Sequence, residues 1–197
     1  LVTATSRLRT GTVDNITTGN SIASNQIGEP TPLKVLPDVT TTRVGWFFKD
    51  RIEHDDLPFA ISTGVRLNYY SALWDLPDPL FDDTNGTPTN ISEWNAQPII
   101  ELDTQLTEEV RAVMRYARGY RAPPIEDAGI GLTNPVFMYT ILPNPNLGSE
   151  TSDSYDLGLT YTNETFAGYV AGYYNFYDGF VENVSLGFNP NIGLSEF

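Results

Sequence analysis

Apolar and polar residues alternate one by one along several stretches of about ten residues, a period of two that is typical of β-strands. The clearest stretch is 154–162, in which one parity is aromatic and aliphatic and the other is small and polar. Similar alternation occurs at 43–52, 59–69, 100–106 and 110–121. Val2–Arg9 is a weaker candidate, and 166–181 is aromatic on both parities. The pattern predicts about seven strands and no amphipathic helix between them.

Short and long connections alternate between these stretches. The short connections are Glu53–Leu57, Thr107–Glu109 and Asn163–Thr165. The long connections, which are rich in Pro, Gly, Asn and Asp, are Gly11–Thr40, Ala72–Gln97 and Ala122–Glu150. A parallel crossover needs a dozen or more residues, so the short connections require antiparallel strands. In an up-and-down sheet, the short turns then lie at one end and the long loops at the other.

The positions of the basic residues distinguish two all-β architectures. A soluble sandwich has an aliphatic inner face and a polar outer face, whereas a transmembrane barrel has an apolar outer face and a wet interior. A cation that faces lipid at mid-depth would cost about 2–4 kcal/mol. Seven strand cations share the polar parity: Arg43, Lys49, Arg51, Arg66, Arg111, Arg115 and Arg121. The pattern therefore favours an antiparallel up-and-down transmembrane β-barrel segment.

Composition excludes several classes of function. With 25 Asp and Glu against 11 Lys and Arg, the formal charge is −14, which argues against a nucleic-acid partner. The 197 residues include no Cys and one His, which removes thiol chemistry, Cys-based metal sites and most His-based catalysis. We therefore expect no enzymatic activity. No apolar run approaches the ~20 residues of a membrane-spanning helix, so any membrane role must use strands.

Several motifs lie at the ends of the predicted strands. A strand-ending box of aromatic, Arg, Ala and Pro residues is present at 116–123, and Asn-Pro-Asn-Leu follows at 144–147. The sequence Glu-Thr-Ser-Asp-Ser-Tyr-Asp-Leu-Gly opens the next strand at 150–158. Together with 37–50 and 62–69 upstream, these motifs resemble the C-terminal half of TonB-dependent outer-membrane receptors.

This resemblance spans most of Leu33–Glu182 and implies a transport function. In this family a barrel of roughly 22 strands is filled by an N-terminal plug domain. We therefore expect residues 1–197 to be a partial TonB-dependent receptor β-barrel domain that lacks the plug domain and is truncated after Phe197. The implied function is active transport of an iron-bearing ligand, haem or a ferric siderophore, across the cell outer membrane, with no intrinsic cofactor. The implied partners are outer-membrane lipid, the TonB complex acting through the plug, and the iron-bearing ligand or its carrier protein.

The box and the Asn-Pro-Asn-Leu motif are especially similar to haem and haemoglobin receptors. In those receptors the loop between the two motifs carries a His that is thought to receive haem, whereas 124–143 contains no His. Tyr139 and Met138 are the alternative axial ligands, because haem iron accepts either residue type. Their apolar surroundings equally suit packing on the barrel rim or contact with a ligand face. We expect the ligand region to comprise Tyr120, Arg121, Phe137, Met138, Tyr139, Asn144, Pro145, Asn146 and Leu147.

The row of arginines on the polar parity has two interpretations. Arg111, Arg115 and Arg121 suit the steering of an anionic ligand. They also suit ion pairs with acidic residues of the same parity, such as Glu101 and Asp103, and this is the favoured interpretation.

Two further features and one alternative fold complete the predictions. His54 is expected to be a solvated turn residue. The acidic loop Asp75–Asp83 lacks the full spacing of a calcium-binding loop and is expected to be a hydrated surface loop. The alternative to a transporter segment is a soluble β-sandwich module that binds a carbohydrate or another ligand on aromatic faces.

Overall fold

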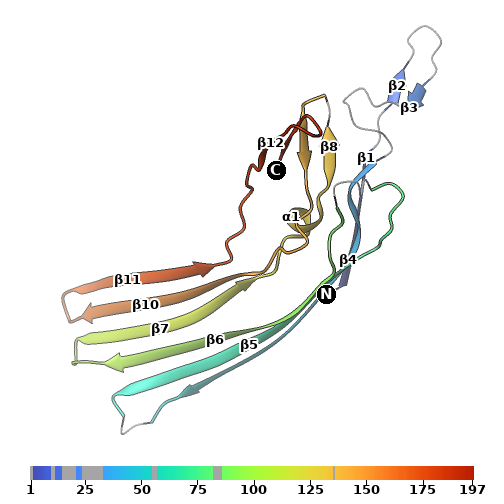
Figure 1. Ribbon diagram of the computed structural model, residues 1–197. Helices are drawn as coiled ribbons and strands as arrows, with labels where there is room; N and C mark the ends of the chain where they lie inside the picture. Colours follow the sequence, from blue (N-terminus) through green and yellow to red (C-terminus); the bar gives the residue numbers. More distant parts are fainter. Residues whose placement is uncertain are drawn as a thin grey trace.

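The computed structural model describes residues 2–9, 12–14, 21–23, 33–54, 57–81, 86–134 and 136–197. Its main element is one antiparallel seven-stranded sheet, whose strands form a curved layer (Figure 1). In spatial order the strands are β1 (Val2–Arg9), β4 (Leu33–Ile52), β5 (Phe59–Trp74), β6 (Ile91–Gln105), β7 (Val110–Arg121), β10 (Glu150–Thr162) and β11 (Ala167–Asp178). The spatial order follows the chain order, which confirms the predicted up-and-down arrangement, including the weaker candidate β1.

The predicted short turns lie together at one end of the sheet, at the left of Figure 1. They join β4 to β5, β6 to β7, and β10 to β11. In the second turn the Val110 amide donates to Thr107 Oγ1 at 3.0 Å, and in the third the Phe166 amide donates to Asn163 Oδ1 at 2.7 Å. Such side-chain acceptors favour tight chain reversals. The long connections lie at the opposite end.

The two faces of the sheet differ in chemistry as the alternation predicts. On the outward face, Trp46 stacks on Trp94 with ring centroids 5.7 Å apart, and Tyr116 lies 5.2 Å from Tyr155. The predicted cations all stand on the opposite, inward parity of their strands. β11, whose faces the sequence leaves undecided, is aromatic on both: Tyr169, Tyr173 and Tyr177 share the inward parity, and Tyr174 and Phe176 the outward parity.

The outward apolar band has the height expected of a transmembrane barrel. On β10, Asp153 marks its upper polar limit and Asn163, just after the strand, marks the lower one. Ten residues at about 3.3 Å each span about 33 Å along the strand, and a tilt near 40° reduces this to about 25 Å. That value matches the apolar band of an outer-membrane barrel.

Three strands are longer than the sequence pattern predicts. β4 begins at Leu33, inside the predicted loop Gly11–Thr40. The predicted loop Ala72–Gln97 is also too long, because β5 continues to Trp74 and β6 begins at Ile91. Above the lipid level an outward residue need not be apolar, so the alternation of apolar and polar residues ends there. The backbone pairing of these strands continues beyond that point.

The loop end contains elements that the sequence analysis does not predict. The one-turn helix α1 (Ile125–Gly129) follows β7, although we expected no helix. A small sheet joins β8 (Leu132–Asn134), β9 (Tyr139–Ile141), β12 (Gly187–Asn189) and β13 (Leu194–Glu196), and a separate hairpin pairs β2 (Thr12–Asp14) with β3 (Ser21–Ala23). β13 pairs with β9 in parallel, so the expectation of purely antiparallel pairing is wrong here. A parallel pair needs a long connection, and 142–193 provides one.

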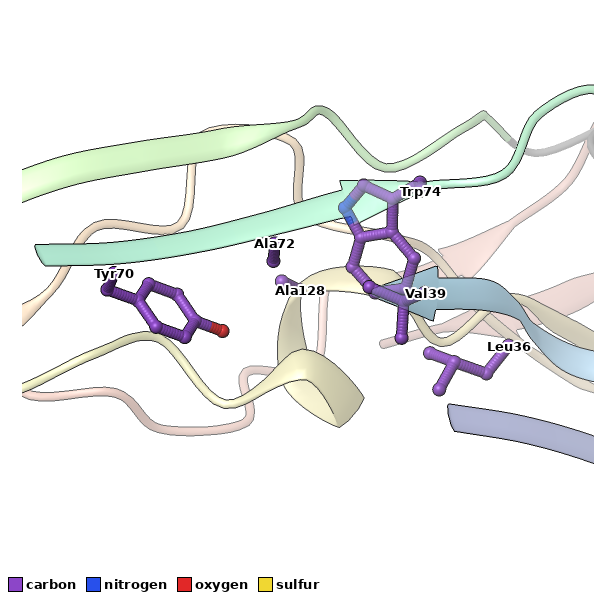
Figure 2. Packing of buried hydrophobic residues seen from close by; sticks show 6 residues of the cluster. All are labelled: Leu36, Val39, Tyr70, Ala72, Trp74 and Ala128. Carbon is purple, nitrogen blue, oxygen red and sulfur yellow. The ribbon is translucent and has the colours of Figure 1, made fainter. Parts of the chain in front are cut away.

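The buried core also lies at the loop end. Figure 2 shows Trp74 and Ala72 of β5 together with Val39 of β4 and Ala128 of α1. Leu36 and Tyr70 complete this cluster. Because Val39, Ala72 and Trp74 have the inward parity, α1 covers the inner face of the sheet rather than its outer face. The core thus holds the chain after β7 against the inside of the barrel wall.

Candidate functional site

A cavity of about 890 Å³ lies between the inner face of β4, β5 and β6 and the segment 120–126 that follows β7. Three arginines line it, namely Arg43 of β4, Arg66 of β5 and Arg121 at the end of β7. Asn68, Gln97, Tyr70 and Tyr120 add neutral polar groups, and Glu126 adds a carboxylate. The site is therefore polar and carries an excess of positive charge, in contrast to the acidic chain as a whole.

The strand parity and the end of β7 together build this cavity. Arg43, Arg66 and Tyr70 are inward residues of neighbouring strands, and Arg43 pairs directly with Tyr70 across β4 and β5. β7 ends at Arg121, where Pro123 and Pro124 cannot donate to a strand ladder. The Tyr70 hydroxyl donates to the Pro123 carbonyl at 3.4 Å, which fixes the departing chain over the sheet.

Each arginine of the cavity has a different local partner. The Arg43 guanidinium lies 5.2 Å from the ring centroid of Tyr70, a cation–π geometry. Arg66 Nε donates to Asn68 Oδ1 at 2.9 Å, and Arg121 donates to Glu150 at 3.0 Å. Arg66 forms no ion pair within the described part of the chain, so its charge is available to an acidic group that enters the cavity.

Tyr120 occupies a special position because β6 and β7 separate beside it. The pairing of these strands ends at Ile99 and Ala117. Above that point the Tyr120 hydroxyl donates to Glu93 of β6 at 2.5 Å. This hydrogen bond links β6 to the end of β7, where the two strands no longer pair.

The predicted ligand residues do not form one site. Tyr120 and Arg121 line the cavity, whereas Phe137 and Met138 lie at the tip of the β8–β9 hairpin, where their side chains are 67% and 56% exposed. Tyr139 is half-buried in β9. The motif at 144–147 forms a turn in which Asn144, Pro145 and Asn146 are exposed and Leu147 packs against the core. Neither Phe137 nor Met138 packs on the barrel rim, because the hairpin carries the pair away from it.

The cavity also uses residues that the sequence analysis did not assign to a site. Arg43, Arg66 and Asn68 come from strands that precede the predicted ligand region by about 50 residues or more. The inward parity of the two arginines was evident in the sequence. Their convergence with Arg121 was not, because it depends on the register of three strands.

The lower arginines are ion-paired, as the favoured interpretation states. Arg111 Nε donates to Asp103 Oδ1 at 2.7 Å, and the second guanidinium nitrogen contacts the other oxygen. Arg51 Nη2 also lies 3.4 Å from Asp103. Arg115 stands 4.0 Å from Asp156. The Arg111 and Arg115 pairs join neighbouring strands, the Arg51 contact reaches across β5 to β6, and none of these residues lines the cavity.

One ion-pair cluster anchors the loop after β5. Lys34 Nζ donates to Asp38 at 2.6 Å and to Asp78 at 2.9 Å. These two hydrogen bonds raise the pKa of Lys34. Burial alone would raise the pKa of Asp78, but the hydrogen bonds from Lys34 and from the Leu80 amide outweigh it and lower that pKa. The acidic loop is thus fixed by a protein cation through Asp78, and Asp82 and Asp83 lie outside the described residues.

The described residues contain no group of three or more His, Asp or Glu side chains that could hold a metal ion. His54 is exposed in the turn after β4, as expected. No helix of the described chain is long and apolar enough to cross a membrane.

A family model described as TonB dependent receptor-like, beta-barrel matches residues 3–195. The chain belongs to this family. Members are receptors of the outer membrane and not enzymes, which confirms the transmembrane barrel wall and sets aside the soluble sandwich. The short turns then face the periplasm and the loop end, with the cationic cavity, faces the cell exterior.

Solved structures show the same fold. The HasR hemophore receptor of Serratia marcescens, a double mutant in complex with its hemophore HasA and heme, matches 99% of this chain and 36% of its own, at 14% identity and a TM-score of 0.63. The copper transporter OprC matches 99% of this chain and 29% of its own, at 12% identity and a TM-score of 0.56. The FrpB iron transporter of Neisseria meningitidis (F3-3 variant) matches 82% of this chain and 21% of its own, at 17% identity and a TM-score of 0.50.

The chain therefore spans between about a fifth and just over a third of the length of these structures. A search of curated proteins found no match.

Proposed function

We propose that this chain is part of the barrel wall of a TonB-dependent receptor that imports an iron-bearing ligand, haem or a ferric siderophore, across the outer membrane. The observation that carries the proposal is the cationic cavity at the loop end, lined by Arg43, Arg66 and Arg121. Haem propionates and the acidic groups of ferric chelates are anions, and guanidinium groups bind carboxylates with matched geometry. Transport itself would require a plug domain and the TonB complex.

Two of the similar structures make iron-bearing cargo the first choice. One is named as an iron transporter and another contains heme and a hemophore. A carrier protein is accordingly a proposed partner at the exposed hairpin tip, where Phe137 and Met138 offer apolar contact area. For haem itself, Tyr139 and Met138 remain the proposed axial ligands in the loop that lacks His.

The test compares Arg66→Gln with Arg115→Gln in the complete receptor that contains this chain. Both residues are inward arginines, but only Arg66 lines the cavity. We expect Arg66→Gln to weaken haem or ferric-chelate binding about tenfold, since a hydrogen bond to a charged group contributes roughly 1.5–3 kcal/mol. Arg115→Gln should leave binding unchanged. Equal effects of the two variants on affinity, measured by titration, would contradict the proposed site.

The axial ligands are tested separately by haem titration. If Tyr139 or Met138 ligates iron, the Soret band should shift when Tyr139→Phe and Met138→Leu are combined. A Soret band that is unchanged in the double variant excludes both residues as ligands, while the arginine comparison still tests the anionic cavity.

A further inference from the structure

We propose that a groove on the outward face of β6, β7, β10 and β11 binds one acyl chain of an outer-membrane lipid with an anionic phosphate head group. The groove has a volume of about 710 Å³. Two neighbouring rows of outward residues form it: Leu102, Met114, Leu157 and Gly172 in the lower row, and Ile100, Tyr116, Tyr155 and Tyr174 in the upper row. The outward side chains that line it are apolar apart from the tyrosine hydroxyls, and the inward residues Arg115, Asp156 and Tyr173 also border it.

The hollow lies where Gly172 adds no side chain to the lower row. Its register partner is Leu157, and the next outward residue toward the loop end is Tyr174. A Cβ added at Gly172 would meet no heavy atom within 4 Å, whereas at the inward Gly158 it would meet the Tyr169 hydroxyl at 2.9 Å. No described residue fills the place of a side chain at Gly172, and this space lies on the outward face of the sheet.

A single cation lies just above this groove. On the outward parity of these four strands, as far as the structure describes them, Arg118 is the one basic residue. It follows Tyr116 by two positions, about 7 Å along β7. Asp153 is its register partner, and that carboxylate accepts a hydrogen bond from the Tyr116 hydroxyl at 2.7 Å. Arg118 forms no ion pair with a described residue, so its guanidinium is available to a phosphate.

The position of the groove makes a lipid its occupant. The groove is continuous with the outward band that faces the membrane, where a protein partner would have to displace lipid. Its apolar rows suit a hydrocarbon chain, and the cation at the loop end suits a head group at the height of the outer leaflet.

The test uses the complete receptor, delipidated in detergent and titrated with phosphatidylglycerol or with phosphatidylcholine of the same chain length. Retained lipid is counted by native mass spectrometry. We expect Gly172→Phe to lower the retained fraction of both lipids about tenfold, because the ring would occupy the space of the acyl chain. Val170→Phe places the same ring on the same face outside the groove lining and should have no effect. Arg118→Gln should weaken retention of phosphatidylglycerol only.

Two results would overturn the proposal. One is an equal loss of lipid in Gly172→Phe and Val170→Phe, which would indicate unspecific contact with the band. The other is an unchanged preference for phosphatidylglycerol in Arg118→Gln. If Gly172→Phe does not fold, Gly172→Val takes its place in the same comparison. Neither result bears on ligand binding in the inner cavity, which the Arg66 variant tests independently.

Discussion

Substitution of Gly129 by Ala should loosen the segment that closes the inner cavity. Gly129 is the last residue of α1 and lies against Trp74 of β5. A Cβ at this position would lie 2.7 Å from Trp74 Cζ3 and 2.9 Å from Leu36 Cδ1, and closer still to Trp74 Cη2. Since ordinary contacts of this kind begin near 3.4 Å, either α1 or the indole must move by at least about 0.7 Å.

The expected magnitude follows from the cost of overpacking a well-filled core. Such insertions cost about 1–3 kcal/mol when the surroundings cannot relax. Here they relax with difficulty, because the Trp74 indole nitrogen donates to the Thr89 carbonyl at 3.0 Å and its amide donates to Asn90 Oδ1 at 2.8 Å. Local opening of the α1 segment should therefore increase about 5- to 150-fold.

Hydrogen exchange of single amides measures this opening. The Gly131 amide donates to the Val35 carbonyl at 2.9 Å and reports directly on contact between the segment and β4. Gly148→Ala is the matched control, since a Cβ there would meet nothing within 4 Å. Trp74→Phe combined with Gly129→Ala should recover part of the protection by removing the clashing ring. Unchanged exchange at Gly131 in the Gly129 variant would refute the packing argument.

Two further predictions concern the ion pairs. The folded state lowers the pKa of Asp78, so the ionised Asp78 stabilises the fold above its ordinary pKa near 3.8, and this stabilisation is lost as the pH falls through the lower folded pKa. Proteolysis of 75–90 should therefore accelerate in acid. Asp78→Asn should show the fast rate of proteolysis already at neutral pH. Asp103→Asn should lower the free energy of unfolding in urea by about 1 kcal/mol, since it removes the negative charge that Arg111 and Arg51 share. Glu53→Gln, which removes only the charge of an exposed partner of Arg51, should have a smaller effect.

Much of the strand wall could be predicted because its pattern is local. The residues between Asp153 and Asn163 meet lipid and interior in strict alternation, so each position records the face on which it lies. The same argument explains where the prediction failed. Between Leu33 and Thr40, and from Ile91 to Gln97, the strands rise above the lipid level, and the alternation no longer marks them as strands.

The site was predicted only in part, for a related reason. Tyr120 and Arg121 end a recognisable strand and proved to line the cavity. Phe137 and Met138 have the composition of a contact surface, but the β8–β9 hairpin places them elsewhere. Composition and motif spacing identify residues suited to binding, whereas the direction in which a long loop folds depends on distant partners.

The sequence by itself determined the class of the fold, its two faces, the family and the ends at which turns and loops lie, because each of these follows from alternation, connection length or motif. Tertiary structure decided which inward cations share a cavity, since cross-strand register brings Arg43 and Arg66 to the end of β7. It also decided the path of the last residues, where β13 pairs in parallel with β9. Strand pairing between distant segments is a long-range interaction, and no local period records it.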